Sequence, residues 1–238
     1  MSALHVLYGG TFDPVHNGHL AIARAARDAL DCDIHLMPAA DPPHRPPPGA
    51  NAEARLAMLQ LAIAGEERLL LDRRELERHA LKGMGRSWSI DTVRDLRVQV
   101  GSKVPIVLLV GADSFIGLPT WKAWRALLDA VHFVVAERPG NPLDAALPTE
   151  LAEAMAGRWT DSVDELGQFP SGRVLRLRQP LHAHSATDLR RRIASGLPWR
   201  HLLPPRVADY IVANGLYGAG AAPADSGTPS SGPESGPL

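Results

Sequence analysis

The stretch "LHVLYGGTFDPVHNGHL", residues 4–20, joins a short apolar run to a glycine-containing loop and the start of a helical pattern. The apolar run predicts a strand, and the segment "HLAIARAARDAL", residues 19–30, carries apolar residues at helical spacing. Gly9 and Gly10 let the backbone turn sharply and allow a ligand to approach the main chain closely. A strand, a loop of this kind and a helix together predict the first unit of an α/β fold.

The rest of the chain continues this alternation of strands and helices. The apolar run "VPIVLLVG" at residues 104–111 indicates a strand that is buried on both faces. We expect strands at residues 33–39, 68–72, 104–113, 132–140 and 172–180, and helices at residues 51–65, 87–101, 121–130, 185–196 and 205–215. The pattern predicts a Rossmann-like, mostly parallel sheet with helices on both faces, in a single α/β domain over residues 1–217.

Polar residues mark the predicted starts of three helices. Asn51 is expected to cap one helix, and either Ser87 or Ser89 is expected to open another. Ser185 and Asp188 are spaced as a capping box. Helix starts matter for function, because their unpaired N–H groups favour anions.

Composition excludes several classes of protein. The 25 basic and 26 acidic residues nearly balance, which gives no sign of a nucleic-acid partner or an anionic membrane. Cys32 is the one cysteine, so the chain can form neither an intrachain disulfide nor a cysteine-rich zinc site. Its neighbours Asp31 and Asp33 raise the pKa of a thiol, which argues against a nucleophile.

The two ends of the sequence suggest where the protein resides. The first ten residues lack the basic region of a signal peptide, and no apolar run approaches the roughly 20 residues of a membrane span. Residues 218–238 are rich in Gly, Pro and Ser and predict a disordered low-complexity tail. We therefore expect a cytoplasmic protein with no nucleic-acid or membrane partner, which could form a homo-oligomer.

Two histidines at the first helix start are the strongest local signal of chemistry. His16 and His19 are three residues apart, so both side chains can face the same side. Two imidazoles beside a helix N-terminus describe a phosphate site. Taken without its surroundings, the pair could instead be structural, with His19 capping the helix or packing under the sheet. The loop matches neither the P-loop pattern nor GxGxxG, and the chain has no HExxH metal motif.

The full string "GGTFDPVHNGH", residues 9–19, resembles the signature of the nucleotidyltransferase superfamily that carries an (H/T)xGH motif. A second segment, "SATDLRRRI" at residues 185–193, is similar to the SxTxIR pattern of that superfamily, with Leu189 in the Ile position. His184 departs from the apolar residue expected there. Taken alone, the second segment could be a capped surface helix with a solvated basic face.

The resemblance implies that both segments hold the phosphates of ATP while its α-phosphate is transferred. It implies catalytic roles for His16, His19 and Arg190. It also implies that ATP is bound by Gly9, Gly10, Thr11, Phe12, Gly18, Gly111, Asp113, Ser185 and Thr187. Mg²⁺ is expected to accompany ATP, held mostly by phosphates and water, so no protein metal site is expected.

Within the superfamily, "PPHR", "SWSIDT", "GADSF", "PTW" and "ERPG" resemble segments of the nicotinate-nucleotide adenylyltransferase family. The resemblance implies that nicotinate mononucleotide is bound by His44, Arg45, Trp88, Ser89, Trp121 and Arg138. Trp121 is expected to stack on the nicotinate ring, although it could also join Trp124 and Leu128 on one helical face and belong to the core.

The implied reaction is the transfer of the adenylyl group of ATP to nicotinate mononucleotide, giving nicotinate adenine dinucleotide and pyrophosphate in NAD biosynthesis. The same chemistry on nicotinamide mononucleotide, phosphopantetheine or a small phosphate remains an alternative, as does a non-catalytic nucleotide sensor. A class I aminoacyl-tRNA synthetase fragment is disfavoured, because the chain lacks a KMSKS-like loop and an RNA-binding domain.

Overall fold

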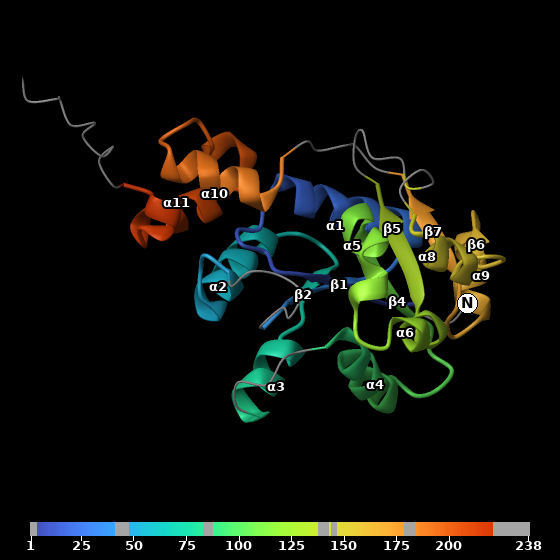
Figure 1. Cartoon of the computed structure of the whole chain (residues 1–238). Coiled ribbons are helices and arrows are strands. Elements are labelled where there is room, and N and C mark those ends of the chain that lie inside the picture. Colours follow the sequence, from blue (N-terminus) through green and yellow to red (C-terminus); the bar gives the residue numbers. More distant parts are fainter. Residues whose placement is uncertain are drawn as a thin grey trace, which may run out of the picture.

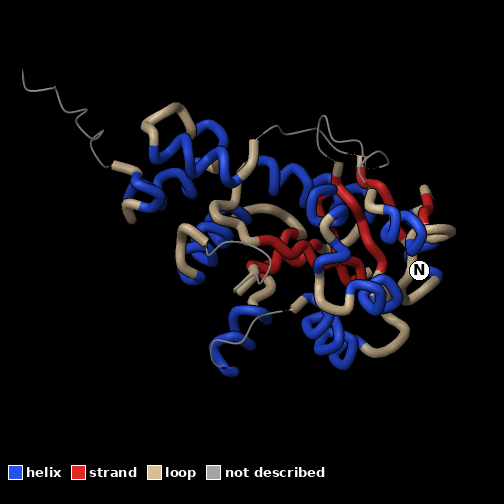
Figure 2. Tube along the Cα trace, in the orientation of Figure 1, coloured by secondary structure: helices blue, strands red, loops and turns tan. Residues whose placement is uncertain are grey.

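The computed structural model describes residues 4–40, 48–82, 88–137, 143, 147–178 and 184–220. A seven-stranded sheet lies at its centre, with strand order β3-β2-β1-β4-β5-β7-β6 and every pair of neighbours parallel. Figure 2 shows the strands gathered in the middle of the molecule with helices around them. The strands are β1 (His5–Gly10), β2 (Ile34–Pro38), β3 (Leu69–Leu71), β4 (Ile106–Gly111), β5 (His132–Ala136), β6 (Trp159–Thr160) and β7 (Val174–Leu177).

The strand order creates a crevice beside β1. The chain runs outward from β1 to β2 and β3, and then returns to place β4 on the other side of β1. Val6 of β1 is aligned with Ile34 of β2 and with Val107 of β4, so the carboxyl ends of these strands meet at one edge. In open parallel sheets, ligands bind where the strand order reverses in this way. The opening glycine loop lies at this switch point.

Helices cover both faces of the sheet, as predicted (Figure 1). One face packs against α1, α2, α10 and α11 through Val6, Ile34 and their equivalents on other strands. The opposite face packs against α4, α5, α6 and α8 through Leu7, Leu108 and Phe133. The helices are α1 (Asn17–Leu30), α2 (Ala52–Ile63), α3 (Arg74–Lys82), α4 (Ser89–Val100), α5 (Ala112–Ile116), α6 (Trp124–Ala130), α8 (Thr149–Ala154), α9 (Val163–Gln168), α10 (Ala186–Ala194) and α11 (Pro205–Ala213).

The central strands carry apolar side chains on both faces, which explains their continuous apolar runs. Successive residues of β1 alternate between the two cores, with Val6 and Tyr8 on one side and Leu7 on the other. All five residues from Ile106 to Val110 are buried. The Rossmann-like fold predicted from the sequence is therefore confirmed, with a sheet that is parallel at every described pairing.

The three helix starts agree with the positions predicted from the sequence. The side chain of Asn51 accepts from the N–H of Ala54 at 2.8 Å, and Ser185 Oγ accepts from the N–H of Asp188 at 3.1 Å. The helix α4 begins at Ser89, one of the two serines expected to open it, and Trp88 occupies the N-cap position. Ser87 lies outside the described residues.

Two differences concern segments without strong apolar spacing. The helix expected at residues 121–130 begins only at Trp124, because a short 3₁₀ helix (Leu118–Thr120) and an extended residue, Trp121, precede it. The helix α3 was not predicted. Among the described helices, none combines the length and apolar character that a membrane span requires. Residues 221–238 of the predicted tail lie outside the described part of the chain.

Candidate active site

Two adjoining cavities open at the carboxyl end of the central strands. We call the first, of about 270 Å³, the aromatic pocket, after Trp88 and Trp121 in its lining. We call the second, of about 430 Å³, the histidine pocket, after His16 and His19. Five residues line both cavities: Gly9, Gly10, Thr11, Asp113 and Ser114. The opening loop and the start of α5 therefore form the boundary at which two bound molecules would meet.

The paired histidines are held in a fixed arrangement at the start of α1. His16 is the extended N-cap residue, and its ring stacks on that of His19 with centroids 3.8 Å apart. The backbone N–H of His16 donates to Nδ1 of His19 at 3.2 Å. Because Nδ1 of His19 accepts a hydrogen bond, a neutral His19 carries its proton on Nε2. The tautomer of His19 is thus suited to donate to an anion.

Phe12 supports this arrangement from inside the protein. Its side chain is buried, and its ring makes an edge contact with the ring of His19 at 5.0 Å between centroids. A Cβ on Gly10 would lie 2.9 Å from Cζ of Phe12, so only glycine leaves room for this ring. Phe12 lines the histidine pocket, but its buried ring makes it a support for His19 more than a ligand contact.

The second motif closes the same cavity from the opposite end of the chain. Ser185, Thr187 and Arg190 all line the histidine pocket. Nη1 of Arg190 donates to the main-chain oxygen of Asp13 at 2.6 Å, and Nη2 donates to Oγ1 of Thr187 at 3.4 Å. The structure therefore brings the paired imidazoles and the guanidinium around one cavity, although about 170 residues separate them. Gly18 and Gly111 line this pocket too.

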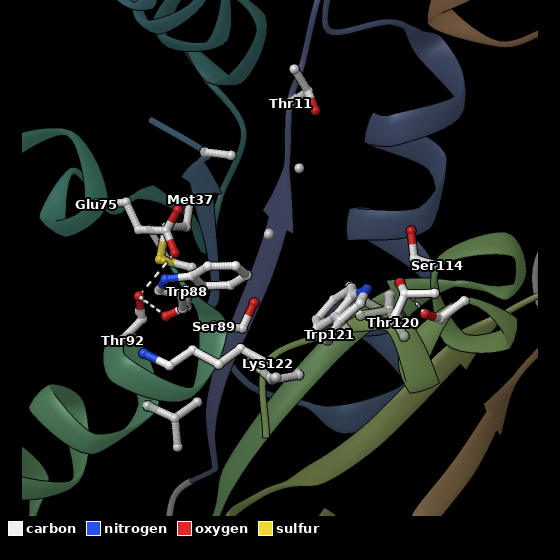
Figure 3. A pocket seen from close by; sticks show the side chains of 18 of the residues that line it. Thr11, Met37, Glu75, Trp88, Ser89, Thr92, Ser114, Thr120, Trp121 and Lys122 are labelled. Carbon is white, nitrogen blue, oxygen red and sulfur yellow. Dashed lines mark hydrogen bonds between the residues drawn. The ribbon is translucent and has the colours of Figure 1, made fainter. Parts of the chain in front are cut away.

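The aromatic pocket has the composition expected for a flat ring. Trp88 lies on one side and Trp121 on the other, with β1 passing between them in the view of Figure 3. Ser89, at the first turn of α4, also lines the cavity. The sequence also allowed Trp121 to share a helical face with Trp124 and belong to the core. In the structure Trp124 is buried on α6, whereas Trp121 precedes that helix and lines the pocket.

Charged groups of both signs surround the aromatic pocket. Nζ of Lys122 lies 3.2 Å from Oδ2 of Asp91 and 5.5 Å from the ring centroid of Trp88. Glu75 is buried, and its Oε1 accepts from Thr92 Oγ1 at 2.9 Å. Lys122 is therefore a cation at the cavity wall, near the start of α4, where N–H groups also favour an anion.

The described linings contain residues to which the sequence gave no role, and three of the expected residues lie outside the described part of the chain. His44, Arg45 and Arg138 lie outside the described residues. Lys122 lines the aromatic pocket and Glu137 lines the histidine pocket, but neither was given a role. Lys122 directly follows the "PTW" segment, and Glu137 is the first residue of the "ERPG" segment. His184, which stands where an apolar residue was expected, also lines the histidine pocket, and its Nδ1 lies 3.3 Å from Oδ2 of Asp188. Its position directly before the second motif is the sequence signal that could have placed His184 at the site.

A possible metal-ligand group lies away from both linings. Ligand atoms of His5, His35 and Asp72 lie within 4.8 Å of one another. Nε of Arg74, however, donates to both carboxylate oxygens of Asp72, at 2.9 and 2.7 Å. A guanidinium there repels a cation, so we assign no metal to this group.

The parallel sheet, the switch-point crevice and the two joined cavities define an α/β nucleotidyltransferase. A family model described as cytidylyltransferase-like matches residues 7–192. A protein of Stenotrophomonas maltophilia named "Probable nicotinate-nucleotide adenylyltransferase" is 56% identical over 91% of this chain and 98% of the relative. One of the same name from Xylella fastidiosa is 46% identical over 92% and 98%. The chain belongs to the nicotinate-nucleotide adenylyltransferase family.

Solved structures agree on the fold. Plasmodium falciparum nicotinic acid mononucleotide adenylyltransferase, complexed with NaAD, superposes with a TM-score of 0.66 and 14% identity, covering 90% of this chain and 97% of that one. The same enzyme complexed with APC gives a TM-score of 0.64 at 14% identity, covering 91% and 98%. At this identity the likeness establishes the architecture alone.

Proposed function

We propose that the chain transfers the adenylyl group of ATP to nicotinate mononucleotide, releasing pyrophosphate and forming nicotinate adenine dinucleotide in NAD biosynthesis. The observation that carries the proposal is the shared wall of the two cavities at Gly9–Thr11 and Asp113–Ser114. A triphosphate in the histidine pocket and a mononucleotide in the aromatic pocket would meet there. The names of the close relatives support the same reaction.

In this proposal the reaction is a direct in-line displacement. A phosphate oxygen of nicotinate mononucleotide attacks the α-phosphorus of ATP; the new P–O bond forms as the bond to the β-phosphate breaks, and pyrophosphate leaves. The nucleophile is already an anion, so no general base is needed. Catalysis then depends on positioning and on stabilising the developing charge.

The histidine pocket supplies this stabilisation. Nε2–H of His19 and the ring of His16 lie where the α-phosphate and the leaving group would sit, at the start of α1. Arg190 and the start of α10, with Ser185 and Thr187, would hold the β- and γ-phosphates. We assign Gly111 and Asp113 to the nucleoside, because a carboxylate can accept from ribose hydroxyls and Gly111 leaves room for the ring.

The aromatic pocket would hold the acceptor. Trp121, and Trp88 opposite it, would pack against the pyridine ring. The N–H groups at Ser89 and the ammonium of Lys122 would face its carboxylate. The roles of His44, Arg45 and Arg138 at the acceptor phosphate stay predictions from the family resemblance.

Mg²⁺ is proposed to bind with ATP. The acidic residues in the described lining of the histidine pocket are Asp13, Asp113 and Glu137. Asp13 accepts from the N–H groups of Gly49 and Ala50, and Oε1 of Glu137 lies 3.5 Å from Nη1 of Arg176. Carboxylates held by protein groups in this way fit a hydrated ion that is bound mainly by ATP. The ion would reduce the negative charge of the phosphates. We further propose that the protein is cytoplasmic, and the proposed reaction is compatible with a homo-oligomer.

Pyrophosphate release with different acceptors tests the proposal. The full chain is incubated with ATP and Mg²⁺, and with nicotinate mononucleotide, nicotinamide mononucleotide or phosphopantetheine in turn. The highest kcat/KM is expected for nicotinate mononucleotide. A preference for another acceptor would replace the substrate and keep the chemistry. ATP binding without pyrophosphate release under every acceptor would instead support a nucleotide sensor.

A further inference from the structure

We propose that Tyr217, at the C-terminal end of the described chain, is a positioning residue for the triphosphate site. Through the buried carboxylate of Asp13, it sets the direction in which Arg190 faces the histidine pocket. The inference rests on the proposed function, in which Arg190 contacts the phosphates of ATP. It also gives the segment after α11 a part in the reaction.

Asp13 connects four parts of the chain. Its carboxylate is 3% exposed and accepts from the N–H groups of Gly49 and Ala50 at 2.7 and 3.0 Å. The hydroxyl of Tyr217 donates to Oδ1 at 2.7 Å, and Nη1 of Arg190 lies 3.4 Å from Oδ2. A buried carboxylate is stable only when its oxygens are bonded in this way. Each of these donors therefore restricts the orientation of the carboxylate, and with it the position of the other donors.

Arg190 is oriented by the same residue. Its Nη1 donates to the main-chain oxygen of Asp13 at 2.6 Å, while Nη2 points to Thr187 in the lining of the histidine pocket. One edge of the guanidinium is thus fixed to the opening loop, and the other is directed at the cavity. A carboxylate that lost a donor would compete more strongly for Arg190 and draw it away from a phosphate.

The backbone around Tyr217 is strained in a way that directs its ring. Tyr217 has φ 58° and ψ 21°, in the left-handed region that residues other than glycine rarely adopt. Its ring lies against Gly49, where an added Cβ would be 3.2 Å from Cε1 of Tyr217 and 3.2 Å from Cδ of Arg190. The ring of Tyr217 and the aliphatic part of the Arg190 side chain therefore pack together beside Gly49.

Tyr217 acts at a distance from the reacting atoms. It lies outside the described linings of both cavities, so its effect must pass through Asp13 and Arg190. Burial and the bond to Asp13 raise the pKa of its phenol above the ordinary value, so the group stays a neutral donor. Its substitution should therefore change ATP binding while leaving the acceptor pocket unaffected.

The test is Tyr217→Phe, which removes only the hydroxyl. We expect the Kd for ATP–Mg²⁺, measured by titration calorimetry on the full chain, and the KM for ATP to rise about 5- to 10-fold, since bonds to charged groups contribute strongly. The KM for nicotinate mononucleotide should stay within about 2-fold, because its pocket is separate. Tyr210→Phe, on α11, is the matched control. Gly49→Ala, which crowds both partners, should raise the ATP constants in the same direction.

A double-mutant cycle separates positioning from a merely structural role. In an Arg190→Ala background, Tyr217→Phe should leave the ATP Kd unchanged. The proposal is overturned if Tyr217→Phe lowers the Tm without changing the ATP constants, or if its effect persists without Arg190. Calorimetry detects ATP binding without turnover, so a wild-type chain that binds ATP and releases no pyrophosphate would remove the proposed function while the Tyr217 result still stands.

Discussion

The two halves of the site are built in different ways. The histidine pocket is formed mainly by two contiguous segments, each at a helix start, and uses backbone N–H groups, imidazoles and a guanidinium. The aromatic pocket is lined by residues of α3, α4, α5, the segment before α6 and three strands. The charged site therefore joins two short motifs, each at a helix start, whereas the site for a flat ring draws on more elements of the fold.

This contrast predicts unequal effects of substitution. The histidine pocket acts on charge that develops during the reaction, so its loss should appear in kcat. The aromatic pocket acts on the bound acceptor, so its loss should appear mainly in KM for that substrate.

The largest effect is expected at His19. His19→Ala removes a donor at the position of the developing charge and should lower kcat at least about 100-fold. Steady-state pyrophosphate release measures it, with His201→Ala, at an exposed position, as control. A near-normal kcat in His19→Ala would contradict the assigned role and weaken the distinction between the two pockets.

A pH effect on stability is expected from His5, the first residue of β1. Burial first, and then the neighbouring His35, lowers the pKa of His5 from 6.5 to about 4. Between these values the unfolded chain binds a proton that the folded chain does not. The free energy of unfolding should therefore fall as the pH drops below about 6.5, by about 1.5 kcal/mol at pH 5 once solvent screening of the partly exposed ring is included.

Urea unfolding at pH 7.5 and pH 5 measures this loss. His5→Leu should flatten the dependence, because Nε2 of His5 is buried with no hydrogen-bond partner among the described residues, so its replacement breaks no hydrogen bond to them. His201→Leu, at an exposed position, should leave the dependence as in the wild type. An unchanged slope in His5→Leu would show that other groups, such as the buried His132, dominate the acid response.

The next largest effect is expected at Trp121, whose loss should weaken binding of the acceptor and leave ATP binding unchanged. Trp121→Ala removes a stacking surface and should raise the KM for nicotinate mononucleotide about 10-fold, with the KM for ATP unchanged. Trp121→Phe keeps a ring and should recover most of the loss. A change of similar size in both KM values would mean that the shared wall, rather than stacking, responds to this side chain.

The same contrast explains what could be predicted from the sequence. The alternating fold followed from apolar spacing, and α3 escaped because its nine residues are mostly charged, with Leu76, Ala80 and Leu81 as the apolar ones. Both helix starts of the histidine pocket lie in contiguous motifs. Lys122 and Tyr217 belong to no motif, since their contacts cross 31 and 204 residues of sequence. Long-range packing leaves no periodic signal.

The smallest effect, and the sharpest test of the aromatic pocket, concerns the choice between acid and amide. Lys122 is partly exposed and paired with Asp91, so its contribution to binding a carboxylate should be modest. Lys122→Met should lower the ratio of kcat/KM for nicotinate over nicotinamide mononucleotide by about 3- to 5-fold.

Two further variants control this measurement. Asp91→Asn removes the competing carboxylate and should raise the same ratio, whereas Lys103→Met, at an exposed position away from the pocket, should leave it unchanged. If Lys122→Met alters both acceptors equally, the charge at the cavity wall does not select the acid. Discrimination would then rest on the N–H groups at the start of α4, and the aromatic pocket would use a helix start in the same way as the histidine pocket.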